Sequence, residues 1–262
     1  MIVTGAVAII LQQSDRYFLK CFADMDQVGV YSMAHKISHS FTTVIMLPFT
    51  MIWNVVAYEH ANSSRADEIY SEVFRFFTTG MVVFLAGVAI VVSPLIHIIG
   101  KSEYSYVANL VPILCIGCFF NCIATFFTLP ARLEKKTLHL LPASIIGAVF
   151  CIAANVAVVP RFGALGAAWV SVGTFAIFAM ANHVICRKVR PIPFPLVAPF
   201  GLGSACVAAS ILYRPMANMI SSFWLFNAIW LLMWLAVAII VLKSPLTWTL
   251  QQLSRRRRSL QS

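Results

Sequence analysis

The side chains best suited to chemistry in this chain are ionisable groups within or beside apolar segments. Asp15 and Arg16 end the first apolar run, and a short polar turn at residues 23–27 follows them. The chain then re-enters apolar sequence that carries three more such groups, His35, Lys36 and His39. Ionisable side chains inside hydrophobic segments are costly, so they usually mark the path of a substrate or an ion. We therefore predict that these residues line such a path.

Lys36 is the strongest of these candidates. If Gln27 opens its helix, Lys36 lies roughly 13 Å further along, at about 1.5 Å per residue. The alternative is that Lys36 extends to the membrane interface, as Arg16 and Lys20 can do from nearer the helix end. Asp15 with His35 or His39 resembles an acid–base pair. No nucleophile lies near them in the sequence, which favours a structural or path-lining role.

The composition indicates an all-α integral membrane protein. Hydrophobic residues make up 60% of the chain and charged residues 11%, against about 45–50% and about 25% in an ordinary soluble domain. The apolar stretches are about 20 residues or longer, which is typical of membrane helices and not of the short alternating strands of a barrel. The first residues lack the basic start and the cleavage site of a signal peptide.

We predict about eight transmembrane helices. Their approximate bounds are Met1 to Leu19, Val28 to Tyr58, Ile69 to Ile99, Tyr104 to Leu129, Leu138 to Val159, Gly163 to Ile185, Leu196 to Leu212 and Ser222 to Leu242. The first has an uninterrupted apolar part that is short for a span of roughly 20 residues. Either the polar residues Gln12 to Asp15 lie in a bundle interior, or part of the helix lies upstream, or both. Pro160 is expected to close the fifth helix.

Small residues open the sixth predicted helix. Gly163, Gly166 and Ala167 are expected to let two helix backbones approach closely, which supplies much of the packing energy in lipid. Three cysteines of the fourth helix share one face, Cys115, Cys118 and Cys122. No histidine or acid stands beside them, so the sequence favours packing over a metal site.

The distribution of Lys and Arg predicts the orientation. Twelve lie in the even-numbered loops and the tail: Arg65, Arg132, Lys135, Lys136, Arg187, Lys188, Arg190, Lys243 and Arg255–Arg258. Four lie on the other side: Lys20, Lys101, Arg161 and Arg214. Positive loops stay in the cytoplasm, so both termini are predicted to be cytoplasmic. The arginine tail is interpreted as a topology anchor beside anionic lipid and not as a nucleic-acid site.

The sequence contains no pattern typical of an enzyme. It lacks a phosphate-binding glycine loop, a Gly-x-Ser-x-Gly elbow and a His-Glu-x-x-His metal pair. We therefore expect neither a catalytic residue nor a cofactor nor a bound metal.

Several motifs follow one another along the chain. They begin with Asp15-Arg-Tyr-Phe-Leu-Lys20, Val28-Gly-Val-Tyr-Ser32 and Ala34-His-Lys-Ile37. Later come Pro48-Phe49 with Trp53, Glu103-Tyr104, Lys135-Lys-Thr137 and the stretch from Pro160 to Ala168. Taken in this order, they resemble the second half of polysaccharide flippases of the multidrug/oligosaccharidyl-lipid/polysaccharide exporter superfamily. Each motif is weak alone, but their order over Ser14 to Ala168 makes the resemblance fairly specific.

The resemblance implies a translocator of undecaprenyl-diphosphate-linked oligosaccharides, such as O-antigen or exopolysaccharide repeat units, in the bacterial inner membrane. Residues 1–190 would form the second six-helix lobe, 191–243 two additional helices and 244–262 a basic cytoplasmic tail. A missing N-terminal lobe or a second copy would complete the transporter. Lys36 would then contact the diphosphate, followed by Arg16, whose charge Asp15 could neutralise. His35, His39 and Asn54 are weaker candidates for sugar or proton contacts.

Two alternatives remain open at this point. One is a cation-coupled exporter of small molecules from the same superfamily, which predicts an acid in the cavity. Asp15 is the acid nearest to the spans, and its place at a helix end ranks this alternative lower. The other is an inactive or scaffold-like membrane protein that associates with glycan enzymes.

Overall fold

The computed structural model describes residues 13–63, 65–99 and 105–194 of the chain, and these residues are helical apart from short connections. A helical segment at 13–22 precedes α2 (Met25–Glu59), α3 (Ala66–Ile99) and α4 (Ser105–Phe127). The short α5 (Leu129–Leu133) and the 3-10 turn η2 (Thr137–His139) lead into α6 (Leu140–Arg187). The described part contains no strand, so the predicted all-α fold is confirmed there.

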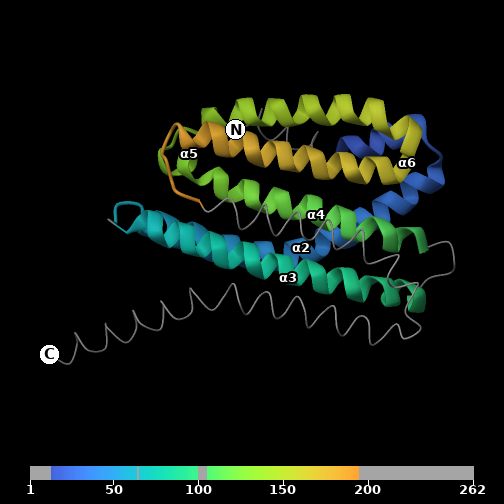
Figure 1. Ribbon diagram of the computed structural model, residues 1–262, viewed down its shortest axis with the longest axis horizontal. Helices are drawn as coiled ribbons and strands as arrows, with labels where there is room; N and C mark the ends of the chain where they lie inside the picture. The colour runs from blue at the N-terminus through green and yellow to red at the C-terminus, as the bar shows by residue number, and fades with distance from the viewer. Residues whose placement is uncertain (1–12, 64, 100–104, 195–262) are drawn as a thin grey trace.

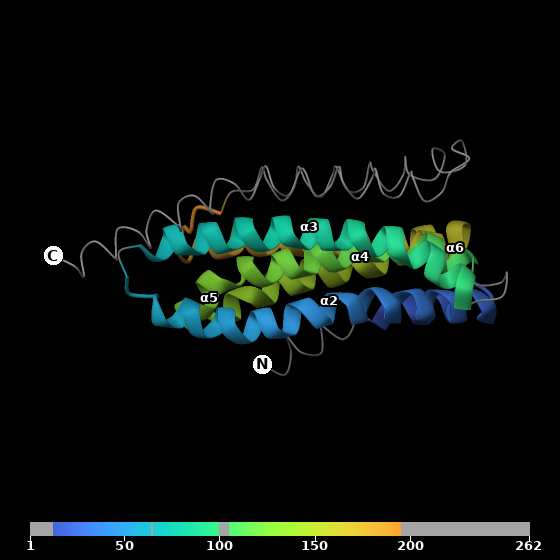
Figure 2. The same ribbon diagram turned by 90° about the horizontal axis from the view of Figure 1, so that it is seen from below.

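The helices run side by side along the long axis of the molecule (Figure 1). α4 lies in the middle of both views, between α3 and α6 in Figure 1 and between α3 and α2 in Figure 2. In the most apolar 18-residue stretch of the helix that contains α4, 72% of the residues are buried. The corresponding share is 17% in α2 and 33% in the helix that contains α6. α4 is therefore the core of the bundle, and α2 keeps one face open.

Three helices in the described residues are long and apolar enough to cross a membrane, namely Met25–Glu59, Tyr106–Leu133 and Thr137–Arg187. This finding is compatible with a multi-pass membrane protein. The predicted total of about eight spans is not confirmed. Most of the first and all of the last two lie outside the described residues, the predicted third span is not among these three helices, and the predicted fifth and sixth spans fall within one of them. α2 and α3 begin about one turn before their predicted starts.

The boundary between the fifth and sixth predicted helices lies at Gly163 and not at Pro160. Residues 140–187 are continuously helical except at Gly163, whose φ of 54° and ψ of −137° break the helix. Pro160 lies inside the first half, where the expected stop does not occur. The chain folds back at the break, so the two halves of α6 run antiparallel (Figure 1).

An aromatic cluster holds α2, α3 and α4 together. Phe49 and Trp53 of α2, Phe74 and Phe77 of α3, and Phe126 of α4 have ring centroids 4.1–5.6 Å apart in their close pairs. Trp53 is 3% exposed, so it packs in the core although its place near the helix end is typical of a membrane-interface residue. Tyr58, one turn further, is exposed.

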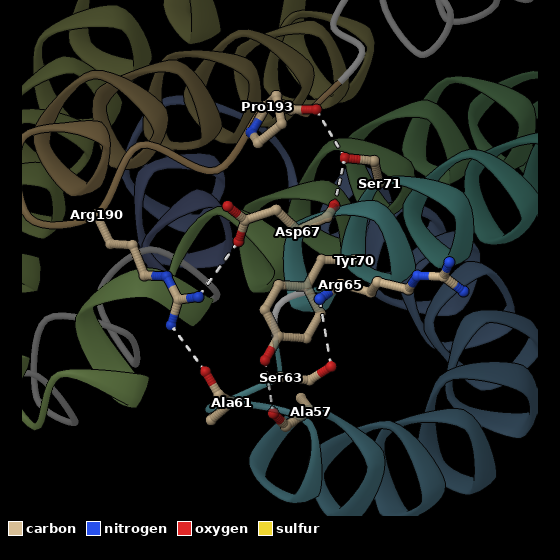
Figure 3. A network of polar contacts seen from close by, with 9 residues as sticks. All are labelled: Ala57, Ala61, Ser63, Arg65, Asp67, Tyr70, Ser71, Arg190 and Pro193. Atoms are coloured by element: carbon tan, nitrogen blue, oxygen red, sulfur yellow. Dashed lines mark hydrogen bonds and ion pairs between the residues drawn. The ribbon is translucent and has the colours of Figure 1, made fainter.

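The segment at 188–194 crosses from the end of α6 to the start of α3 (Figure 3). Arg190 Nη2 lies 3.3 Å from Asp67 Oδ1, and its Nη1 donates to the Ala61 carbonyl at 3.4 Å. Ser71 Oγ donates to the Pro193 carbonyl at 2.8 Å. The buried Phe194 ring packs on Phe74, with centroids 5.1 Å apart. We call residues 188–194 the strap.

The strap, the α2–α3 connection and the α5–η2 connection lie at one end of the bundle (Figure 1). These connections and the helix ends beside them carry the described basic residues of the side predicted to be cytoplasmic, namely Arg65, Arg132, Lys135, Lys136, Arg187, Lys188 and Arg190. The turn before α2 and the break at Gly163 lie at the other end. The charge count thus separates the two ends of the helix bundle, whereas the side of a membrane that each end faces stays a prediction.

Candidate functional site

The end of the bundle near the turn at residues 23–24 brings most of the candidate residues together. Helix 13–22 supplies Asp15 and Arg16, and α2 supplies His35, Lys36 and His39. α2 begins at Met25, so Lys36 lies roughly 16 Å along it at about 1.5 Å per residue. The side chains of Asp15 and Arg16 make different contacts, and they form two neighbouring polar groups.

Asp15 lies in a buried polar cluster between helix 13–22, α2 and the two halves of α6. Its Oδ2 accepts the Tyr31 hydroxyl proton at 2.7 Å and a short hydrogen bond from Ser171 Oγ. Its Oδ1 accepts from Asn155 Nδ2 at 2.9 Å. These partners are donors, and an ionised carboxylate is acceptor-only, so the arrangement fits a carboxylate. The side chain is 4% exposed.

Cys151 and Ser14 complete this cluster. Ser14 Oγ lies 3.2 Å from Cys151 Sγ, and Cys151 Sγ lies 3.8 Å from Asp15 Oδ1. The amide of Asn155 also donates to the Cys151 carbonyl at 2.9 Å, while its Oδ1 is buried without a partner in the described residues. The cluster therefore holds one acid and one free amide oxygen away from the bundle surface.

Arg16 belongs to the second group and makes no ion pair with Asp15. Its Nη1 donates to Gln13 Oε1 at 3.0 Å, and its Nη2 lies 3.3 Å from His35 Nδ1. In the described residues the ion pair between Arg190 and Asp67 is at the opposite end of the bundle. Asp15 and Arg16, although adjacent in sequence, are thus not joined by an ion pair, and whether Asp15 offsets the charge of Arg16 stays a prediction.

His35 and His39 extend this group along α2. Their rings are nearly parallel, with centroids 6.0 Å apart and an interplanar angle of 14°. His35 is half-buried and also faces Tyr31, whereas His39 is exposed and contacts the Thr43 hydroxyl at 3.1 Å. The i, i+4 spacing places both rings on one face of the helix.

Lys36 is exposed on α2 and has no ion-pair partner among the described residues. It is next to His35 in sequence and three residues before His39, which is a neighbouring position on the helix surface. Asn54 lies 18 residues beyond Lys36 and past Pro48, so it is roughly 27 Å away along the helix at about 1.5 Å per residue. The structure does not bring Asn54 into the site.

The predicted small-residue motif lies at the fold of α6. A Cβ at Gly166 would lie 2.8 Å from Phe162 Cβ and 3.0 Å from Val158 Cγ1, so this glycine allows a close approach across the break. Ala167 is fully buried in the core. Gly163 has a different role, because its positive φ makes the break itself.

Gln27 was not singled out by the sequence, yet it fixes this break. Its Oε1 accepts the backbone N–H of Ala164 at 3.0 Å, one of the donors that a helix start leaves without an intrahelical partner. A Cβ at Gly163 would lie 2.1 Å from the same oxygen. Gln27 therefore ties the start of α2 to the second half of α6.

Tyr31, Asn155 and Ser171 were also missed. Each is a polar side chain within an apolar helix, which is the signal that could have identified it. Their spacing could not show that they share one partner, because they are separated by up to 140 residues.

Comparison with models of known protein families, with curated proteins and with solved structures finds no significant match to this chain.

Proposed function

We propose that this chain takes part in the translocation of a lipid-linked glycan, with a polyprenyl diphosphate as the anionic part of the substrate. The observation that carries the proposal is the cationic and imidazole row formed by Arg16, His35, Lys36 and His39 on one side of the bundle. The motif resemblance suggests the substrate class. The row supplies the positive charge and the hydrogen-bonding groups that an anionic diphosphate needs.

A diphosphate needs compensation to cross a hydrocarbon core about 30 Å thick. Lys36 is a compact, flexible charge that suits phosphate, and it has no competing acid in the described residues. Arg16 is held by Gln13 and His35 and not by Asp15, so its positive charge also remains available. We propose that Lys36 contacts the diphosphate and that the charge of Arg16 adds to the positive electrostatic potential around it.

The open face of α2 supports a two-lobe arrangement. Only 17% of the residues in the apolar 18-residue stretch of α2 are buried. In transporters built from two repeats, the substrate path lies at the interface between the repeats. We propose that a first lobe or a second copy of this chain covers that face, in a bacterial inner membrane with both termini in the cytoplasm. On this proposal the 262-residue chain alone does not restore export in a flippase-deficient strain.

Binding to lipid nanodiscs tests the proposal directly. The full chain should bind undecaprenyl diphosphate more tightly than undecaprenol, which has the same tail and no charge. The preference should weaken as salt is raised, because the attraction is electrostatic and partly exposed. Equal binding of the two lipids would overturn the proposal.

The buried Asp15 cluster favours a second candidate, a cation-coupled exporter of small molecules. This candidate predicts an acid within the transport domain, and Asp15 lies deep between helices with the free Asn155 oxygen beside it. Protonation of Asp15 or binding of a monovalent cation would change the contacts that join helix 13–22 to α6. Transport that follows a sodium or proton gradient, is lost in Asp15→Asn and shows no requirement for diphosphate would favour this candidate.

A further inference from the structure

The hydrogen bond between Arg16 and His35 fixes the position of the proton on the His35 ring. A guanidinium is a donor at every nitrogen and cannot accept. Because Arg16 Nη2 lies 3.3 Å from His35 Nδ1, that ring nitrogen must be the acceptor. The neutral His35 ring therefore carries its proton on Nε2.

The contacts of Thr43 fix the opposite arrangement on His39. Thr43 Oγ1 lies 2.7 Å from the His39 carbonyl oxygen, which can only accept, so the single hydroxyl proton of Thr43 is used there. The same Oγ1 lies 3.1 Å from His39 Nδ1. With its own proton committed, the hydroxyl accepts, and His39 Nδ1 must carry the ring proton. The Nε2 of His39 is then a free acceptor.

Both Nε2 atoms are open to a ligand. Neither makes a hydrogen bond with the described residues, and neither is among the buried side-chain atoms without a partner. The stacked rings thus present one N–H donor and one bare nitrogen, with centroids 6.0 Å apart. The donor and acceptor directions of one hydroxyl oxygen meet at a near-tetrahedral angle, so two neighbouring hydroxyls of a sugar, and not a single one, suit nitrogens on rings this far apart.

From this geometry we propose that His35 and His39 form a site for a sugar, one of whose hydroxyls accepts from His35 Nε2–H while a neighbouring hydroxyl donates to His39 Nε2. A phosphate would need two donors, and a metal ion would need two bare nitrogens. Each hydroxyl can both donate and accept, so a pair of hydroxyls matches one donor and one acceptor. The proposal rests on the proposed function, and it assigns the glycan's first sugar to the histidine pair while Lys36 takes the adjoining diphosphate.

The proton positions can be read without any ligand. In ¹⁵N-histidine-labelled full chain in nanodiscs at neutral pH, protonated and bare ring nitrogens resonate far apart. We expect His35 to be protonated on Nε2 and His39 on Nδ1, with assignment by His35→Gln and His39→Gln. The same tautomer on both rings would overturn the site, whatever transport assays show, so its failure is separable from that of the proposed function.

Thr43→Val should remove the hydroxyl that holds the ring proton of His39 on Nδ1, so the proton should shift toward Nε2. Thr50→Val is the matched control, because Thr50 Oγ1 donates to the Leu47 carbonyl at 3.0 Å on the same helix and contacts no histidine. The control should leave both rings unchanged. A His39 proton that stays on Nδ1 in Thr43→Val would contradict the assignment.

The ligand test uses undecaprenyl-diphosphate-linked N-acetylglucosamine, with undecaprenyl diphosphate as the sugar-free arm. The sugar-bearing lipid should move the Nε2 resonances of both histidines, and the sugar-free lipid should not. Loss of a neutral hydrogen bond of about 0.5–1.5 kcal/mol corresponds to about two- to twelvefold weaker binding, so His39→Phe should show a drop of this size for the sugar-bearing lipid only. Equal shifts with both lipids would assign the pair to phosphate and overturn the proposal.

Discussion

Asp15 and Arg16 are neighbours in sequence, but their side chains bind different partners. Asp15 Oδ2 accepts from the Tyr31 hydroxyl at 2.7 Å, while Arg16 Nη2 lies 3.3 Å from His35 Nδ1. One tyrosine and one histidine of α2, a single turn apart, thus hold the two charges separately. This separation leaves a buried acid on the α6 side and, beside the histidine pair, an arginine that makes no ion pair with any described residue.

The first prediction concerns Asp15→Asn. The substitution keeps the shape but places an NH₂ group among three donors, from Tyr31, Ser171 and Asn155. Removal of a charge from an apolar helix favours insertion, but each buried donor left without a partner costs about 1–3 kcal/mol. We expect the second effect to prevail and the melting temperature in detergent to fall.

Asp26→Asn is the matched control, because Asp26 is exposed in the first turn of α2. It should change the melting temperature little. If Asp15→Asn had the same melting temperature as Asp26→Asn, the hydrogen bonds of the buried cluster would not contribute to stability.

The second prediction concerns the helix break. Gly163→Ala forces a side chain into a positive φ with a ψ of −137°, which costs about 1–3 kcal/mol, and places its Cβ 2.1 Å from Gln27 Oε1. We expect a marked loss of folded protein by fluorescence size-exclusion chromatography. Gln27→Ala in the same chain should restore part of it, because the steric contact disappears. The recovery stays partial, since the backbone strain remains and the Ala164 N–H loses its acceptor.

Gly29→Ala is the control for this pair. A Cβ at Gly29 meets nothing within 4 Å, and Ala is favoured over Gly in a helix by about 1 kcal/mol. The variant should be as abundant as the parent chain or more so. Equal behaviour of the two glycine variants would contradict the role assigned to Gly163.

The third prediction compares two side chains of the strap. Arg190 pairs with Asp67 at 3.3 Å, with 25% and 46% of the two side chains exposed, and such pairs contribute about 0–1 kcal/mol. Phe194 is 8% exposed against Phe74 and Phe127, and Phe→Ala in a core costs about 3–5 kcal/mol. Phe194→Ala should therefore lower the melting temperature much more than Arg190→Ala. The reverse order would show that the ion pair holds the strap.

For the described residues the sequence predicted the all-helical fold, because long apolar stretches can satisfy their backbone groups in only a few ways. Composition and length carry that information without any knowledge of packing. The position of the break in α6 could not be predicted in the same way. Pro160 is tolerated inside the helix, and Gly163 takes the break because Gln27, 136 residues earlier, caps the helix half that follows.

The candidate site was predicted in part for a similar reason. The cost of ionisable groups in apolar segments identified Asp15, Arg16, His35, Lys36 and His39, and the structure brings them to one region of the bundle. It could not reveal that Asp15 and Arg16 bind different partners, since this depends on Tyr31 and His35 lying on adjacent turns of α2. Nor could it show how far Asn54 lies from the other candidates, because that distance follows from the unbroken course of α2 past Pro48.

The fourth prediction concerns topology. The basic connections at one end of the bundle are expected to face the cytoplasm, because Lys and Arg are retained there. A reporter fused after Lys136 should be active as a cytoplasmic protein, and one fused after Arg161 as a periplasmic protein. Reporters on the same side would contradict the crossing of the membrane by the first half of α6.

The last prediction concerns Lys36. It is exposed on α2 and has no acid partner in the described residues, so its removal leaves no buried charge behind. Lys at the centre of a membrane helix costs about 2.5–3.5 kcal/mol on insertion scales, so Lys36→Ala should be as abundant as the parent chain. When the Lys36→Ala chain is co-expressed with a lobe that completes the transporter, glycan export should nevertheless be lost.

Lys36→Arg separates the roles that Lys36 could have. It keeps the charge but replaces a compact ammonium by a planar fork, so it should retain part of the export. Lys188→Ala, which removes an exposed lysine of the strap, is the control and should export normally. A lysine that only extends to the interface would make Lys36→Ala neutral in both assays. Normal export by a normally abundant Lys36→Ala protein would therefore refute a contact between Lys36 and the diphosphate.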